Sequence, residues 1–212
     1  MEQYTAATTF LDYNSPEIQG LIAEFKSDSL SLKEKAIGVY TKIRDGYRYN
    51  AYNITLNKDK FKASYLAKQK EGHCVDKAIL LTAALRGLNI PARIRLAKVT
   101  NHIAVERLTN RFGTNILTPH GMVEVYLDGW WIKATPAFNK ELCILCKVAP
   151  LEFDGKTDSM FQEYNTDGQQ FMEYLEDYGS FEDVPVDFMM KNLLEHYPGV
   201  FDPKNGNVDY KF

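Results

Sequence analysis

The sequence predicts an α+β fold in which helices pack on an antiparallel sheet. Two capped helix starts come early in the chain, and residues 75–88 are apolar nearly all round. A helix that is apolar on every side is buried in a protein core. Residues 120–139 then contain two runs of alternating residues around Asp128-Gly129, which indicates a β-hairpin. Helices followed by paired strands are typical of the α+β class.

Two helices are expected early in the chain. Ser15 is placed to cap the first, with Pro16 at its first position, where a proline is well tolerated. The second starts at Ser31-Leu32-Lys33-Glu34, which fits the capping-box pattern, and apolar residues follow at helical spacing towards Arg44. Residues 46–72 are polar and rich in tyrosine, and we expect a long functional loop whose aromatic side chains pack.

The buried helix is expected to run from Val75 to Leu88. Gly72 precedes it and lets the chain turn sharply, and Gly87 together with Pro91 marks its end. Residues 92–99 then alternate between apolar and polar side chains, which predicts a strand.

The Asp128-Gly129 turn fixes the register of the hairpin. A two-residue turn places Leu127 opposite Trp130 and Glu124 opposite Lys133. We expect Glu124 and Lys133 to form a cross-strand ion pair. Trp130 shares its face with the valines of the first strand, so we expect that face, and Trp130 with it, to lie in the core.

The other face of the hairpin carries the polar residues of interest. His120 begins this face, and Thr135 and Asn139 are its diagonal neighbours. Diagonal Cβ atoms are about 7–8 Å apart, so their side chains can interact. Trp131 lies on the same face but farther along the hairpin, and we expect it to pack rather than to bind substrate.

Residues 151–212 are predicted to be an acidic elaboration that packs on a core of residues 1–150. They contain no obvious core of their own, and the expected elements are a strand and turn over 150–155, a helix within 168–178 and a helix over 187–197. Residues 1–150 carry 21 Lys+Arg and 14 Asp+Glu, a net charge of +7, whereas residues 151–212 carry 4 and 14, a net charge of −10. If the acidic segment borders the active-site cleft, it should disfavour acidic substrates.

Composition argues against several classes of protein. The net charge of −3 argues against a nucleic-acid binder, and no apolar run approaches the roughly 18 residues that span a membrane. No targeting segment is visible, and three cysteines are too few for a disulfide scaffold, so we expect a cytoplasmic protein. Cys143 and Cys146 form a lone C-x-x-C pair, which we attribute to packing because a zinc site usually needs a second close pair. No metal or cofactor is expected.

Cys74 is the candidate nucleophile. It opens the buried helix, and a helix N-terminus carries partial positive charge and free N–H groups. These features lower the pKa of a thiol and populate the nucleophilic thiolate. A histidine on a neighbouring strand can accept the thiol proton, and the backbone N–H of Cys74 is placed to stabilise an oxyanion. The alternative is an inert, buried cysteine.

Two sequence patterns surround these candidates. Gly72-His73-Cys74-Val75-Asp76-Lys77-Ala78 precedes the helix interior, and Ile90-Pro91-Ala92-Arg93 follows the helix. The second pattern consists of His120, Val123-Glu124-Val125-Tyr126, Gly129-Trp130-Trp131 and Thr135-Pro136. Together, over roughly residues 30–140, they resemble the two conserved boxes of the transglutaminase-like superfamily. The resemblance implies a papain-like fold in which Cys74 is the nucleophile and His120 is the general base.

One position departs from the pattern of this superfamily. An aspartate usually stands four residues after the tryptophan of the second strand and orients the histidine, but this chain has Thr135 there. A hydroxyl can accept an imidazole N–H but brings no charge to stabilise an imidazolium. Thr135 is therefore one candidate for orienting His120, and Asn139 is the other, through its amide oxygen as in Cys-His-Asn proteases. The string Lys133–Asn139 is also similar to an uncharacterised bacterial branch of the superfamily.

Two functions fit these residues. The first is a cysteine enzyme that performs acyl transfer or amide hydrolysis through a thioester on Cys74, with a peptide, a protein or a small amide as its substrate. The second is a catalytically silent binding module that keeps the cleft, which the missing aspartate favours. The substrate, the acyl acceptor and the oligomeric state stay open, because this superfamily hosts several chemistries.

Overall fold

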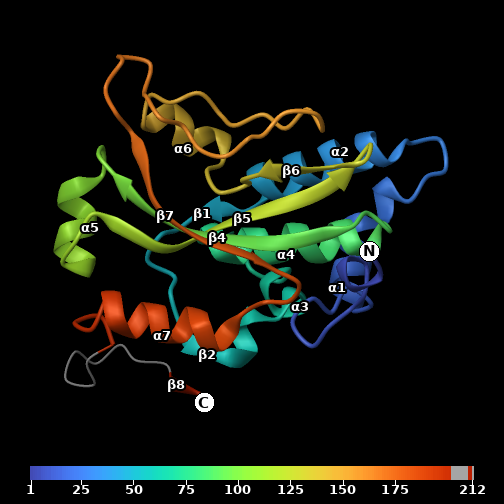
Figure 1. The fold of residues 1–212 in the computed structure, drawn as a ribbon, viewed down its shortest axis with the longest axis horizontal. Coiled ribbons are helices and arrows are strands. Elements are labelled where there is room, and N and C mark those ends of the chain that lie inside the picture. Colours follow the sequence, from blue (N-terminus) through green and yellow to red (C-terminus); the bar gives the residue numbers. More distant parts are fainter. Residues whose placement is uncertain (202–209, 212) are drawn as a thin grey trace.

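A curled four-stranded antiparallel sheet packs against a central helix (Figure 1). The computed structural model describes residues 1–201 and the backbone of residues 210–211. The strand order is β6-β5-β4-β7, and these strands are β4 (Ala92–Asn101), β5 (Ile116–Leu127), β6 (Trp130–Ala134) and β7 (Met172–Phe181). Shorter strands form two parallel pairs: β1 (Arg48–Tyr49) with β3 (Glu71–Gly72), and β2 (Leu56–Asn57) with β8 (Tyr210–Lys211).

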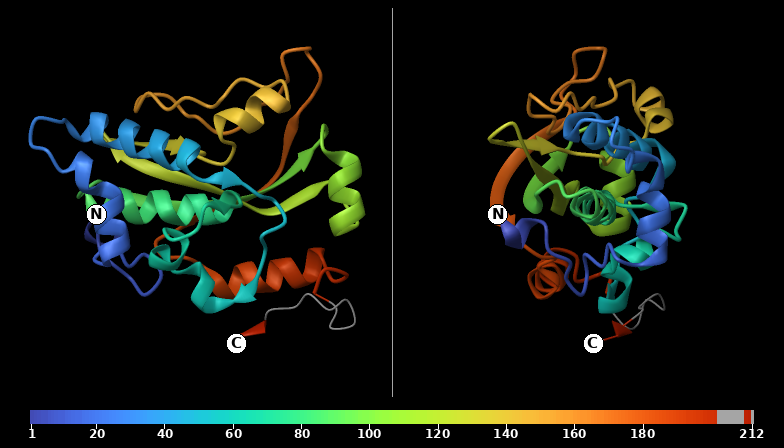
Figure 2. Two further views of the ribbon diagram at one scale, coloured as in Figure 1. Left: turned by 180° about the vertical axis from the view of Figure 1, so that it is seen from behind. Right: turned by 90° about the vertical axis from the view of Figure 1, so that its right-hand side faces the viewer.

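Helix α4 (Cys74–Gly87) lies between the sheet and the N-terminal helices (Figure 2). The other helices among the described residues are α1 (Pro16–Ile22), α2 (Leu32–Gly46), α3 (Ala63–Leu66), α5 (Val105–Phe112), α6 (Lys140–Leu145) and α7 (Val186–His196), with 3-10 turns at Glu2–Tyr4, Ala23–Phe25 and Lys58–Phe61. All residues of α4 from Cys74 to Arg86 are buried, which confirms the prediction of a core helix and follows from its apolar surface on every side.

The predicted helix starts are confirmed. The Ser15 side chain accepts a hydrogen bond from the Ile18 N–H, and Pro16 begins α1. Ser31 and Glu34 form both bonds of a capping box at the start of α2. These signals are reliable because each joins groups only three residues apart.

Two buried charges of α4 hold the surrounding chain together. The Lys77 ammonium donates to the carbonyls of Arg44, Tyr47 and Ala137 at 2.7–2.8 Å. The guanidinium of Arg86 donates to carbonyls of the N-terminal segment, of β4 and of the chain after β7, at residues 6, 92 and 182. Because all these acceptors are main-chain groups, the two side chains tie distant segments to one helix.

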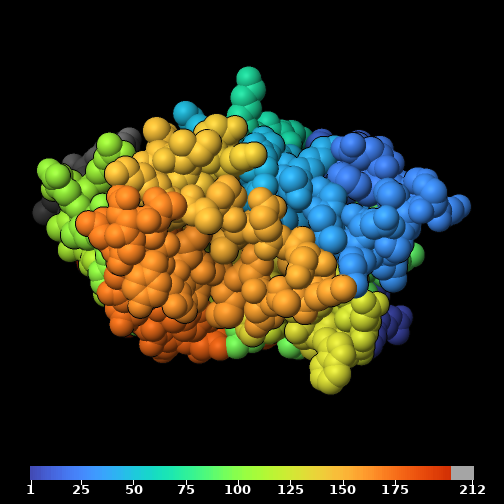
Figure 3. Space-filling model, turned by 90° about the horizontal axis from the view of Figure 1, so that it is seen from above, coloured from blue at the N-terminus to red at the C-terminus, as the bar shows by residue number. Residues whose placement is uncertain are grey.

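The predicted hairpin register is confirmed, but the burial of Trp130 is not. Leu127 pairs with Trp130 and Glu124 pairs with Lys133, and Asp128 and Gly129 both have the positive φ that this turn requires. The prediction that Trp130 lies in the core is wrong, because its side chain is 75% exposed. The end of the hairpin (yellow) projects from the surface (Figure 3), whereas Val123 and Val125 of the same face are buried, as expected.

The predicted ion pair between Glu124 and Lys133 is also wrong. The carboxylate of Glu124 binds Arg93 and Arg95 instead, at 2.5 and 2.8 Å. Lys133 binds Asp158 at 2.7 Å. Arg93 lies directly opposite Glu124 on β4, so the neighbouring strand on the other side supplies a closer partner than the hairpin itself.

Two elements expected after residue 150 differ from the structure. Residues 168–178, expected as a helix, enter strand β7, because pairing with β4 along its length overrides the local helical spacing. No strand forms over 150–155, but the expected turn is present and is made by Asp154, whose side chain accepts two backbone N–H groups. The helix predicted over 187–197 is confirmed as α7.

The segment after residue 150 contacts the preceding residues extensively. Strand β7 forms an edge of the four-stranded sheet, and α7 lies against β5. Tyr197, just after α7, donates to the Ile116 carbonyl and accepts from the Thr118 N–H. The division of the chain at residue 150 stays a prediction.

Acidic residues of this segment pair with basic residues of residues 1–150. The pairs include Arg95–Asp177, Lys98–Glu176, Lys58–Asp187, Lys133–Asp158, Lys147–Asp167 and Arg44–Glu152. Part of the opposite net charge of the two parts is therefore neutralised by ion pairs where the parts meet. Among the described residues, no helix combines the length and the apolar character needed to cross a membrane.

Candidate active site

Cys74 is the first residue of α4, and a capping box built on His73 holds it there. The Nδ1 atom of His73 accepts from the Asp76 N–H at 3.2 Å, and the Asp76 carboxylate accepts from the His73 N–H at 3.0 Å. Gly72 is needed for space, because a Cβ atom there would lie 2.9 Å from the Cβ of Asp76. The N-terminus of the helix is thus fixed by the residues on both sides of the thiol.

Strand β5 crosses the first turn of α4 at very short range. A Cβ atom on Gly121 would lie 2.7 Å from the Cα of Val75, so only a glycine allows this approach. Strand β6 pairs with β5 only over Val123–Leu127, and the edge of β5 before it is free to receive Cys74. The thiol faces that edge, with Sγ 3.9 Å from the Pro119 carbonyl oxygen.

Burial raises the pKa of the Cys74 thiol to about 11. The backbone N–H groups of Gly121 and Val75 act in the opposite direction, because they favour the thiolate. The sequence led us to expect a thiol pKa lowered by the helix N-terminus, but in this structure burial outweighs that effect. Cys74 is therefore a neutral thiol at pH 7.

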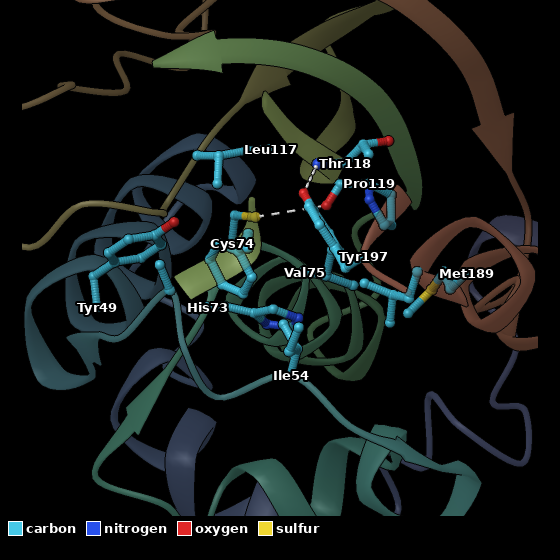
Figure 4. A pocket seen from close by; sticks show the side chains of 13 residues that line it. Tyr49, Ile54, His73, Cys74, Val75, Leu117, Thr118, Pro119, Met189 and Tyr197 are labelled. Carbon is cyan, nitrogen blue, oxygen red and sulfur yellow. Dashed lines mark hydrogen bonds between the residues drawn. The ribbon is translucent and has the colours of Figure 1, made fainter. Parts of the chain in front are cut away.

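A small apolar pocket leads to Cys74 (Figure 4). Its volume is about 30 Å³, close to the space that one water molecule takes up in the liquid. Tyr49 and Ile54 of the tyrosine-rich loop line one part of it, so the expected packing role of that loop is joined by a role at the site. Met189, Leu193 and Tyr197 line another part, so the segment after residue 150 borders the thiol through uncharged side chains.

His120 lies on the same stretch of β5, but its ring forms no hydrogen bond with Cys74. Side chains alternate along a strand, and the Cβ direction of Gly121 meets α4, so the imidazole points to the other face. There it lines a narrow space, too small for a water molecule, together with Thr135 and Gln162. Neither ring nitrogen has a hydrogen-bond partner among the described residues, and burial lowers the pKa of His120 to about 4.

The two residues expected to orient His120 differ in their contacts. Thr135 lies in the same narrow space, and its Oγ1 also has no partner among the described residues. The amide of Asn139 is used elsewhere: its oxygen accepts from the Tyr49 N–H at 2.9 Å, and its nitrogen donates to Glu141 at 2.6 Å. The structure thus brings Thr135 to the histidine and directs Asn139 towards the tyrosine-rich loop.

Gln162 is a polar residue of this space that the sequence did not reveal. Its amide nitrogen donates to the Ala149 carbonyl at 2.9 Å, and a carbonyl can only accept. The amide is therefore held in one orientation, with Oε1 on the other side and without a partner among the described residues. No local motif marks Gln162, because it reaches the site through the irregular chain between α6 and β7.

The described residues contain no cluster of three or more His, Cys, Asp or Glu side chains suited to a metal ion. All three cysteines are free. Cys143 is buried, with its thiol 3.8 Å from the Phe138 carbonyl and from the Gln162 amide nitrogen. Cys146 is half-buried and lies on the wall of a second cavity.

Comparison with known proteins identifies the family. The family model of the transglutaminase-like superfamily matches residues 19–136, more than half of the chain, so the chain belongs to this superfamily. Its α+β fold is similar to that of a "Putative Cysteine Protease from Cytophaga hutchinsonii", with a TM-score of 0.50 and 14% sequence identity. The alignment covers 88% of this chain and 48% of that protein, so the chain spans about half of its length. No curated protein matches the chain.

Proposed function

We propose that this protein is a cysteine enzyme that cleaves or transfers acyl groups from amides, with Cys74 as nucleophile and His120 as general base. The observation that carries the proposal is the position of the thiol. It opens a buried helix and faces the edge of β5 at the peptide groups on either side of His120, since Pro119 and Gly121 both face the sulfur. Free cysteines support a reducing, cytoplasmic location.

The resting pair is uncharged, because the pKa of Cys74 is raised to about 11 and that of His120 is lowered to about 4. Proton transfer requires the imidazole to turn around the edge of β5 towards the sulfur. No hydrogen bond to a described residue has to break for this turn, since both ring nitrogens lack partners there. Catalytic contacts often tighten only when substrate binds.

The covalent step follows from these positions. His120 takes the proton of the thiol as sulfur attacks the carbonyl carbon of the amide, and the carbonyl oxygen gains negative charge near the N–H of Cys74. The C–N bond then breaks, and the amine leaves with the proton from His120. Water or a second amine attacks the thioester and releases the acyl group, which regenerates the thiol.

Three residues are candidates to position the neutral His120 ring by accepting a hydrogen bond from its N–H group. Thr135 and Gln162 share its narrow space, and each has an oxygen without a partner among the described residues. Asn139 would first have to release the Tyr49 N–H. An oxygen acceptor on one ring nitrogen would leave the other free to act as the base.

The competing proposal is a silent binding module, which the buried thiol and its separation from the imidazole support. Alkylation of Cys74 by iodoacetamide, followed by peptide mass spectrometry, tests the two proposals. For the enzyme, we expect Cys74 to be alkylated near pH 7 at least about tenfold faster in the unaltered protein than in a His120→Gln variant, because the imidazole takes the thiol proton as the sulfur reacts.

Matched histidine variants complete this test. His120→Gln should slow the alkylation of Cys74, whereas His102→Gln should leave its rate unchanged, since His102 lies near Glu173 and lines neither pocket. Equal alkylation rates of Cys74 in the unaltered protein and in His120→Gln would favour the silent module.

Gln162 variants test the positioning of His120. Gln162→Met removes the acceptor and should slow the alkylation of Cys74 by about tenfold. Gln162→Glu places a carboxylate beside the imidazole, which should raise the pKa of His120 and move the acid limb of the rate profile to higher pH. Changes in stability with an unmoved pH profile would assign Gln162 a purely structural role.

A further inference from the structure

A second cavity adjoins the pocket of Cys74. Its volume is about 240 Å³, and Tyr49, Ala51 and Leu117 line both it and the smaller pocket. In the close view, Tyr49 and Leu117 flank Cys74 on the side away from Tyr197 (Figure 4). A group held in the second cavity would therefore lie beside any carbonyl that reaches the thiol.

The size and the walls of this cavity fit one apolar side chain. Rings and aliphatic groups from β1 and the following loop, from α5, from the start of β5, from the chain between β6 and α6, from α6 and from the residue before β7 form most of it, including those of Tyr52, Leu108, Phe138, Leu142 and Phe171. A cavity of about 150 Å³ lined by apolar groups can bind benzene. The larger space here accommodates a phenyl ring together with the carbon chain that joins it to the rest of a substrate.

One positively charged side chain lines this cavity. Arg107 of α5 is the single charged residue among the described residues that line it. Arg107 is exposed and forms no ion pair with any residue that the structure describes. Arginine binds carboxylates through paired N–H groups, so an unpaired guanidinium at the rim of an apolar cavity suits an apolar ligand that carries a carboxylate.

We propose that this cavity binds an aromatic or branched aliphatic side chain of the substrate, and that Arg107 binds a carboxylate of the same substrate. The inference rests on the proposed function only in calling the ligand a substrate. It also changes one expectation from the sequence. The acidic segment borders both pockets through uncharged residues such as Phe171 and Tyr197, so among the described lining residues an anionic substrate meets Arg107 and no carboxylate.

Cys146 provides a test of binding that does not involve Cys74, because it is half-buried and lines this cavity. The probe is 3-phenylpropanoate, and the readout is the rate at which iodoacetamide alkylates Cys146. We expect 3-phenylpropanoate to protect Cys146, and 3-phenylpropanamide and propanoate to protect it at least about tenfold more weakly, which corresponds to 1.4 kcal/mol or more. Equal protection by all three compounds, or none, would overturn the proposal.

Variants separate the two parts of the proposed site. Arg107→Gln should weaken protection by 3-phenylpropanoate about tenfold and leave 3-phenylpropanamide unchanged. Arg111→Gln, on the same helix but outside the cavity, is the matched control and should change neither. Ala104→Phe should fill the cavity and abolish protection by every phenyl compound, with an unchanged circular dichroism spectrum as the check on folding. If Arg111→Gln had the same effect as Arg107→Gln, the carboxylate site would be overturned.

A second probe connects the cavity to Cys74. N-Chloroacetyl-phenylalanine alkylates a thiol as a new S–C bond displaces chloride, and N-chloroacetyl-glycine is its counterpart without the ring. We expect the phenylalanine probe to label Cys74 at least about tenfold faster, and Ala104→Phe to remove the difference. Equal labelling of Cys74 by both probes would overturn the substrate role even if Cys146 is protected. Protection of Cys146 with no labelling of Cys74 by iodoacetamide would instead contradict the proposed enzyme and support the cavity as a ligand site.

Discussion

Lys77 and His120 are both buried titratable residues near the thiol, yet the structure treats their polar atoms in opposite ways. The three N–H donors of the Lys77 ammonium meet three carbonyl oxygens. Both nitrogens of His120 lack any partner among the described residues. Burial lowers the pKa of each, to about 7 for Lys77 and about 4 for His120, but only the lysine is compensated by hydrogen bonds.

This difference indicates a structural role for Lys77, whereas the ring of His120 is not fixed by hydrogen bonds. Buried polar groups in native proteins are nearly always paired, so an unpaired one calls for an explanation. The Lys77 side chain joins the end of α2, the residue just before β1 and the chain after β6 to the helix that carries Cys74. The ring of His120 forms no such bond, so no hydrogen bond to a described residue holds it in place if a reaction requires it to move.

Substitution of Lys77 is expected to lower the free energy of unfolding by the largest amount. Lys77→Met keeps much of the volume but leaves three buried carbonyls without donors, which should lower the free energy of unfolding by about 3 kcal/mol or more. Chemical denaturation followed by circular dichroism measures this loss. Lys98→Met is the matched control, because Lys98 pairs at the surface with Glu176, and it should cost less than about 1 kcal/mol. Equal effects of the two substitutions would remove the contrast between Lys77 and His120.

The next effect concerns His120 and the pH. The pKa of His120 falls from its ordinary 6.5 to about 4 in the folded protein, so the unfolded chain binds more protons between these two values. Folding stability should therefore be lost as the pH falls through this window, by up to about 3 kcal/mol. His120→Gln should remove this part of the pH dependence, and His196→Gln should not. If the free energy of unfolding changed by the same amount between pH 4 and 7 in His120→Gln and in the unaltered protein, that result would contradict the burial of a neutral imidazole.

The smallest effect compares two buried threonines. Thr82 donates to the Ala78 carbonyl at 2.8 Å, whereas Oγ1 of Thr135 has no partner among the described residues. Thr82→Val should cost about 1 kcal/mol, because it removes a satisfied hydrogen bond. Thr135→Val should be neutral or slightly stabilising, since it removes an unpaired hydroxyl. Thermal unfolding of both variants decides, and a larger loss for Thr135→Val would show that Thr135 is hydrogen-bonded in solution.

Short-range signals predicted much of the fold. The capping box at Ser31, the turn at Asp128-Gly129 and the all-apolar helix α4 each depend on residues close in sequence, and all are confirmed. The superfamily could also be predicted from short-range patterns, because its two boxes contain the helix start and the hairpin. These patterns are also the ones that position Cys74 and the strand bearing His120.

Contacts between distant segments account for the errors. Residues 168–178 have helical spacing, but pairing with β4 makes them part of a strand. Glu124 finds Arg93 on a strand about thirty residues earlier. Gln162 could not be predicted for the same reason, since it meets His120 only after the chain between α6 and β7 has folded over the sheet. The error at Trp130 has a different cause. Alternation predicts which face of the hairpin carries this side chain, but it does not predict that the end of the hairpin extends beyond its neighbours.

The wall that Tyr197 and α7 build over Cys74 has a consequence for a chain that is still being synthesised. Cys74 leaves the ribosome 123 residues before Tyr197, and at ordinary rates of synthesis that interval lasts on the order of ten seconds. During this time α4 lacks the part of its pocket that Met189, Leu193 and Tyr197 later provide. The nascent chain therefore carries a more exposed thiol than the folded protein, in which α7 and Tyr197 help to bury Cys74.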